Sequence, residues 1–75
     1  MDSINGLVML GKKQLDDGCY DKALSLFEQA ILINQKDPDL WNLKGIALRS
    51  LGRYDEAIEC FNKSLEIDPR DKNAS

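Results

Sequence analysis

Residues 18–24 read GCYDKAL, and residues 52–58 read GRYDEAI. The two stretches lie 34 residues apart, and the same step separates Phe27 from Phe61. Two further pairs keep this step: Gly11 with Gly45, and Ile33 with Ile67. A fixed period of this length is typical of proteins built from stacked supersecondary units, each of which buries its apolar face against a neighbour. The chain is therefore predicted to contain two copies of one such unit.

Apolar residues within each period recur at helical spacing. In residues 4–16 and 21–34 they are separated mainly by three or four positions, which places them on one face of a helix. The second period repeats this arrangement, and no stretch alternates apolar and polar residues as a half-buried strand does. We therefore predict an all-α fold of two tandem helix-turn-helix hairpins, at residues 3–36 and 37–70, followed by a polar tail at residues 71–75.

Local signals mark the expected helix ends. Gly18 and Gly52 stand where the first helix of each hairpin should end, because glycine adopts the left-handed conformation there without steric cost. Asp37 followed by Pro38 predicts a helix start, with aspartate as the cap and proline at the first helical position. Asp68 precedes a proline, which pushes its backbone out of the helical region. The last helix is therefore predicted to end there.

Gly11 and Gly45 fall inside expected helices, where glycine costs about 1 kcal/mol relative to alanine. Their recurrence at one phase of the period predicts a close approach of the partner helix. We expect the small residues Ala23 and Ala57 to lie opposite the two glycines. Aromatic residues are expected to fill the wider end of each hairpin: Tyr20, Phe27, Tyr54 and Phe61.

Composition excludes several classes of protein. Ten basic and thirteen acidic side chains give the 75 residues a net charge of −3. The basic residues are scattered, so no nucleic-acid partner is expected. The longest apolar run, Ile31-Leu32-Ile33, is far shorter than the roughly 20 residues of a spanning helix, so no membrane association is expected. The amino terminus lacks the basic and apolar regions of a secretory signal, and we expect a cytoplasmic protein.

Residues with catalytic or metal-binding chemistry are sparse. The sequence has no histidine, and the acid pairs at residues 16–17 and at Asp37/Asp39 lie at expected helix boundaries, where capping and solvation account for them. Cys19 and Cys60 form neither a CxxC motif nor a four-ligand zinc pattern. We expect two reduced thiols, with one disulfide between them as the alternative. The sequence predicts a non-enzymatic chain with no catalytic residues, metal site or cofactor.

The second period carries a recognisable motif. Trp41-x-x-Lys44-Gly45-x-x-Leu48 is followed by Tyr54, Ala57, Phe61 and Pro69. The first period matches through Leu7-x-x-Leu10-Gly11, Tyr20, Ala23, Phe27 and Ala30. Together these residues resemble the tetratricopeptide repeat signature over roughly residues 3–70. The resemblance is specific for the fold and unspecific for the partner.

Resemblance to tetratricopeptide repeats implies that the first helix of each hairpin lines a concave groove, in which family members hold a peptide or partner segment. The groove residues implied by this resemblance are Asn5, Val8, Lys12, Leu15, Asp39, Asn42, Ile46 and Arg49. A mixture of charged, amide and aliphatic side chains suits an extended peptide held by hydrogen bonds and shallow apolar contacts. The first interpretation is a non-catalytic protein–protein interaction module or scaffold that binds a protein or peptide partner.

The last helix leads to other interpretations. Repeat arrays generally need about three units or a capping helix, because a terminal unit leaves an apolar face uncovered. Ile58 and Leu65 are expected on that face, and the tail that follows is too short and too polar to cover it. The alternatives are a fragment of a longer repeat protein, a structural unit that self-associates through the Ile58 and Leu65 face, and a marginal two-repeat monomer.

Overall fold

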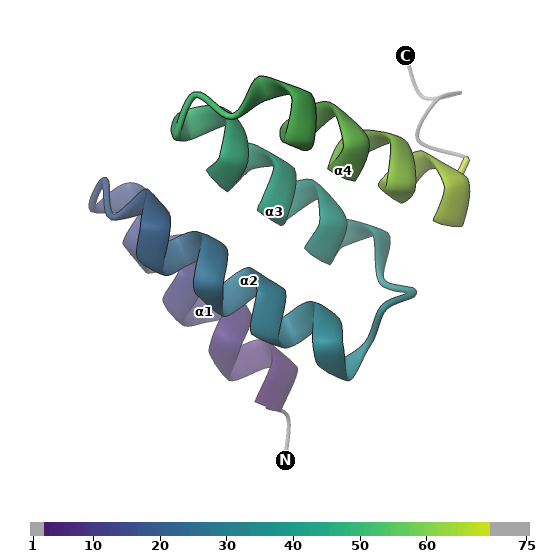
Figure 1. Cartoon of the computed structure of the whole chain (residues 1–75). Helices are drawn as coiled ribbons and strands as arrows, with labels where there is room; N and C mark the ends of the chain where they lie inside the picture. Colours follow the sequence, from purple (N-terminus) through teal and green to yellow (C-terminus); the bar gives the residue numbers. More distant parts are fainter. Residues whose placement is uncertain (1–2, 70–75) are drawn as a thin grey trace.

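The computed structural model describes residues 3–69, which form four α-helices joined by short turns (Figure 1). The helices are α1 (Ser3–Asp16), α2 (Tyr20–Ile33), α3 (Pro38–Ser50) and α4 (Tyr54–Ile67). Helices α1 and α2 form one hairpin, α3 and α4 form the other, and no strand occurs within residues 3–69. The predicted all-α fold of two helical hairpins is confirmed. The predicted polar tail at residues 71–75 lies outside the described part of the chain.

A glycine in the left-handed conformation closes each hairpin turn. Gly18 has a φ of 81° and Gly52 a φ of 82°, values that residues with a side chain rarely adopt. At the first turn the N–H of Gly18 donates to the Leu15 carbonyl at 3.1 Å, and the N–H of Cys19 donates to the Gln14 carbonyl at 2.8 Å. The second turn repeats both bonds. This Schellman motif satisfies the last carbonyls of the helix, and both predicted helix ends are confirmed.

The start of α3 and the end of α4 also follow their local signals. The Asp37 side chain accepts a hydrogen bond from the N–H of Asp39 at 2.9 Å, and Pro38 occupies the first helical position. Helix α4 ends at Ile67, with Asp68 as its C-cap. Acidic side chains in the first turns of α2 and α4 interact favourably with the helix dipole.

The helices pack in chain order, α1 on α2, α2 on α3 and α3 on α4, so that α2 contacts both α1 and α3 (Figure 1). One cluster of buried residues joins the two hairpins through Leu24, Phe27 and Leu48. A second cluster brings Ile31 of α2 together with Leu40 of α3. Trp41 packs against both clusters. The apolar surface buried between α2 and α3 is therefore what holds one hairpin to the other.

The two glycines inside helices face phenylalanine rings. A Cβ atom added to Gly11 would lie 2.5 Å from Cε1 of Phe27, and one added to Gly45 would lie 2.5 Å from Cε1 of Phe61. In both cases the three nearest atoms belong to that ring. The nearest neighbours of the two glycines are therefore phenylalanine ring atoms, and not the alanines that the sequence led us to expect there, Ala23 and Ala57. A flat ring from the partner helix lies over the glycine backbone, so the glycine makes room for a side chain.

The four aromatic residues do not share one role, which corrects a second expectation. Phe27 is fully buried, whereas Tyr54 is 62% exposed and does not fill its hairpin. Its counterpart Tyr20 is half-buried and lines a hollow together with Leu51 of the second hairpin. Tyr20 is therefore covered by a neighbouring hairpin, and Tyr54 has no such neighbour within residues 3–69.

Candidate functional site

A groove of about 370 Å³ lies between α1 and α3. Its lining combines aliphatic, amide, acidic and basic side chains: Ile4, Asn5, Val8, Lys12, Asp37, Asp39, Leu40, Asn42 and Leu43. The volume falls in the range of roughly 300–1,000 Å³ that is usual for ligand sites in proteins. We call these nine residues the α1–α3 groove.

The structure brings together five of the eight residues implied by the sequence. They line the α1–α3 groove from two helices: Asn5, Val8, Lys12, Asp39 and Asn42. Leu15, Ile46 and Arg49 are not part of its lining. Leu15 packs instead against the buried cluster that joins the hairpins. The Arg49 guanidinium lies 6.0 Å from the centre of the Phe61 ring, within the distance of a cation–π contact.

Four groove residues were missed by sequence reasoning: Ile4, Asp37, Leu40 and Leu43. Two of them could have been found, because Ile4 precedes Val8 by one helical turn and Leu43 follows Asp39 by the same distance. Asp37 was recognised only as a helix cap. Leu40 is 1% exposed and belongs to the core, so it forms the floor of the groove.

Charge is distributed unevenly along the α1–α3 groove. Asp37 and Asp39 lie at the start of α3, where the Asp37 side chain already accepts the N–H of Asp39. Lys12 follows Asn5 by seven residues on α1, which corresponds to about 10 Å of helix. The groove therefore has an acidic end and a basic side chain, with apolar and amide groups beside them.

The comparisons with known proteins agree with the fold of helical hairpins. The sequence model of the tetratricopeptide repeat matches residues 38–71, the second period. A TPR repeat-containing protein of Methanocaldococcus jannaschii is 48% identical over 51 residues, which are 68% of this chain and 16% of that protein. The chain belongs to the tetratricopeptide repeat family. Tetratricopeptide repeats are in general non-catalytic protein-interaction elements, and the chain is an interaction module in this general sense.

Two further relatives show how this tetratricopeptide repeat chain compares with longer proteins. An uncharacterized protein of Methanocaldococcus jannaschii is 47% identical over 51 residues, 68% of this chain and 59% of the relative. The peroxisomal targeting signal receptor of Saccharomyces cerevisiae is 34% identical over 50 residues, 67% of this chain and 8% of the receptor. The chain thus matches less than two thirds of the length of each of these relatives.

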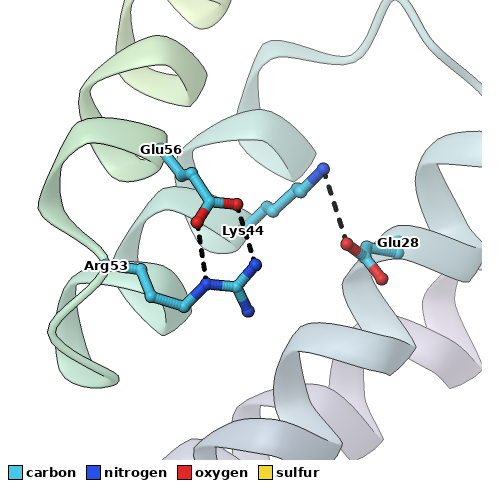
Figure 2. A network of polar contacts seen from close by, with 4 residues as sticks. All are labelled: Glu28, Lys44, Arg53 and Glu56. Carbon is cyan, nitrogen blue, oxygen red and sulfur yellow. Dashed lines mark hydrogen bonds and ion pairs between the residues drawn. The ribbon is translucent and has the colours of Figure 1, made fainter.

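A second hollow in this repeat pair, of about 280 Å³, lies among α2, α3 and α4. We call it the charged hollow, and its lining is Glu28, Trp41, Lys44, Leu48, Glu56, Glu59, Cys60 and Lys63. The Lys44 ammonium lies 3.6 Å from the Glu28 carboxylate across the hairpin interface (Figure 2). The same ammonium lies 5.4 Å from the centre of the Trp41 ring. The acidic side chains and the lysines of the charged hollow therefore largely neutralise one another.

The Arg53 guanidinium donates two hydrogen bonds to the Glu56 carboxylate, each 2.8 Å long (Figure 2). These bonds lower the pKa of Glu56 below its ordinary value and raise the pKa of Arg53. Both side chains are about half exposed, at 52% and 49%. Solvent therefore screens the pair, and its contribution is local, at the start of α4.

Both cysteines of the repeat pair are free thiols. Cys19 is half-buried, whereas Cys60 is 5% exposed at the charged hollow. Burial raises the pKa of the Cys60 thiol above its ordinary value, so less of it is in the nucleophilic thiolate form at neutral pH. Among residues 3–69 no three potential metal-binding side chains are grouped together. Within the same residues, no helix has the length and apolar character needed to cross a bilayer.

Proposed function

We propose that the chain binds an extended peptide segment of a partner protein in the α1–α3 groove. The observation that carries this proposal is the gathering of Asn5, Val8 and Lys12 from α1 with Asp39 and Asn42 from α3 around one hollow. Family membership supports protein binding in general, and the mixed lining of the groove supports the proposal that a peptide binds there.

The chemistry of the groove suits a peptide rather than a small apolar ligand. Asn42 is half-buried, and its side-chain amide can donate to a peptide carbonyl and accept from a peptide N–H. Val8 and Leu43 offer shallow apolar contact on either side of it. The acidic end at Asp37 and Asp39 favours a basic side chain of the peptide, and Lys12 favours an acidic one. These charges give the bound segment a preferred direction.

Selection from a random peptide library against the whole chain provides a ligand for the test. The double variant Lys12→Ala with Asn42→Ala should weaken binding of the selected peptides at least tenfold in a fluorescence anisotropy titration. Lys13→Ala is the matched control, because Lys13 is the neighbouring lysine on α1, its side chain is 70% exposed, and it does not line the groove. Unchanged affinity of the double variant, or equal loss in the Lys13 variant, would refute the assignment of the groove.

Side-chain amide signals in nuclear magnetic resonance spectra locate the peptide directly. The Asn42 amide should shift on addition of a selected peptide, and the amide of Asn62, which lies on α4 outside the groove, should not. A shift confined to Asn62 would move the binding site to another face.

A second proposal is self-association through the face that carries Ile58 and Leu65. Ile58 is 55% exposed, and Leu65 is half-buried. Exposure of a large aliphatic residue at this phase of the repeat favours association, because its counterpart in α2 is covered by the next hairpin.

A further inference from the structure

The outer face of α4 repeats the face with which α2 receives α3. Leu24 and Ile31 of α2 are 8% and 7% exposed because α3 packs on them. The residues 34 positions later on α4 are Ile58, which is 55% exposed, and Leu65, which is half-buried. We call Tyr54, Ile58 and Leu65 the tail face. It has the composition of an interface that already exists once in this molecule, and no helix within residues 3–69 covers it.

The opposite end of the molecule carries a hollow at the equivalent positions of the first repeat. A hollow between α1 and α2 is lined by Leu10, Gln14, Lys22, Ser25, Leu26 and Gln29, and we call it the head hollow. The residue that lies 34 positions after each of these six residues lines the charged hollow between the hairpins. Two lining residues of the charged hollow have no counterpart in the head hollow: Trp41, and Glu28 from the second helix of the preceding hairpin.

The repeat period identifies the helix that would supply a counterpart of Glu28 to the head hollow. The position equivalent to Glu28 is Asn62, which lies on α4 beside the tail face. An α4 helix placed against α1 of another copy, as α2 is placed against α3, would therefore complete the head hollow and cover the tail face together. Leu10, 47% exposed, would then lie against Asn62 of the other copy, because their counterparts Lys44 and Glu28 lie 3.6 Å apart across the hairpin interface.

Charge favours this pairing over a symmetric one. Helix α4 holds four acids and one lysine, so its net charge is −3, whereas α1 holds two lysines and one acid, for a net charge of +1. Two α4 helices brought face to face would repel each other. An α4 helix on an α1 helix would attract.

We propose that copies of this chain associate head to tail, with α1 of one copy docked on the tail face of the next; this inference rests on the self-association proposed above. The contact is heterologous, since different surfaces meet, and it leaves a free head and a free tail on every assembly. It also places α1 of the added copy beside α3 of the first. The α1–α3 groove is thereby continued from one copy to the next.

Sedimentation velocity of the whole chain, from micromolar to millimolar concentration, tests the proposal. The sedimentation coefficient of the unaltered chain should rise steadily with concentration, because a heterologous contact does not close. Leu10→Glu and Ile58→Glu should each weaken association at least tenfold, since each places a charge in one half of the contact. Leu32→Glu is the matched control: Leu32 is 77% exposed on α2 outside both faces, and its repeat counterpart is Glu66.

Mixing the two variants separates head-to-tail from symmetric association. The Leu10→Glu chain keeps an intact tail and the Ile58→Glu chain an intact head, so an equimolar mixture should form a 1:1 complex and grow no further. Circular dichroism checks that both variants fold, and Tyr54→Glu provides a second tail variant at a position that is 62% exposed. A monomer at every concentration of the unaltered chain overturns the proposal. So does a loss of association in the tail variants alone, or a mixture that stays monomeric.

Discussion

Two glycine–phenylalanine contacts set the distance between the helices of each hairpin. Gly11 and Gly45 each leave space that a ring carbon occupies, so any side chain at these positions competes with the ring for the same volume. The surroundings of the two rings differ, however. Phe27 is fully buried between the hairpins, whereas Phe61 is only partly buried. The first ring is held from both sides, and the second can move toward solvent.

This difference predicts unequal effects of one substitution. Alanine gains about 1 kcal/mol of helix propensity over glycine, and overpacking of a core costs roughly 1–3 kcal/mol. Gly11→Ala should therefore destabilise the fold by about 1–2 kcal/mol, while Gly45→Ala should come close to neutral. Urea unfolding followed by circular dichroism measures both. Equal stabilisation by the two variants would show that neither ring is constrained.

Ser64 places a hydroxyl where the first repeat has a methyl group. Its side chain is 1% exposed, and its Oγ has no hydrogen-bond partner among the described residues. Its repeat counterpart Ala30 is fully buried. An unpaired buried hydroxyl costs roughly 1–3 kcal/mol. Ser64 therefore stands out as a destabilising residue of the core.

Replacing this serine should stabilise the protein. Ser64→Ala removes the unpaired group and should raise the free energy of unfolding by about 1 kcal/mol or more. Ser25→Ala on the exposed surface of α2 is the control, because it gains helix propensity of roughly 0.5 kcal/mol and loses only an exposed hydrogen bond of 3.4 Å from Gln29. Thermal unfolding of the two variants gives the comparison. A gain at Ser64 no larger than that at Ser25 would mean that the hydroxyl finds a partner in solution.

At the scale of the helix, the sequence predicts where each helix ends more accurately than which side chains its faces bring into contact. The turn glycines and the Asp37 cap act through backbone hydrogen bonds of a few residues, so a local signal predicts them. The Arg53–Glu56 pair adds a side-chain contact at the start of α4. Two hydrogen bonds join these residues, which are three positions apart in the sequence. Such a pair is weak when exposed, but it makes the first turn of α4 sensitive to pH.

The sign of this sensitivity follows from the pKa of Glu56, which the Arg53 hydrogen bonds lower. A carboxyl with a lowered pKa in the folded state stabilises the fold above its unfolded pKa, and this stabilisation is lost as the pH falls through the folded value. Glu56→Gln should therefore reduce the loss of thermal stability between neutral and acidic pH. Glu59→Gln is the control, since Glu59 has no ion pair within residues 3–69. Equal pH profiles for Glu56→Gln and the unaltered chain would contradict the expectation.

At the scale of the whole molecule, the period of 34 residues predicted the hairpins and their stacking, because a repeat must bury the same face in each copy. The residues inside the contacts were less predictable. A helix-interior glycine indicates that space is needed, but not whether Phe27 or Ala23 fills it. The choice depends on how two helices cross, and that geometry is set by all their side chains together.

The residues of the α1–α3 groove were also only partly predictable from the sequence. Asn5 and Asn42 were assigned to the groove because the resemblance to tetratricopeptide repeats implies which helix face lines it. Arg49 was assigned to the same face but lies near the Phe61 ring and does not line the groove. A long side chain can contact any of several neighbouring elements. The sequence therefore predicts which helix face a residue lies on, but not which neighbour its side chain contacts.

The single tryptophan stands where the two hairpins meet. Its ring packs against both buried clusters, and its Nε1 donates to the carbonyl of Gln35 in the connecting loop at 2.9 Å. Separation of the hairpins would therefore expose the indole ring of Trp41 to water even if every helix stayed intact. Trp41 gives the chain an intrinsic fluorophore whose emission colour reports the joint between the hairpins, while far-ultraviolet ellipticity reports the helices on either side.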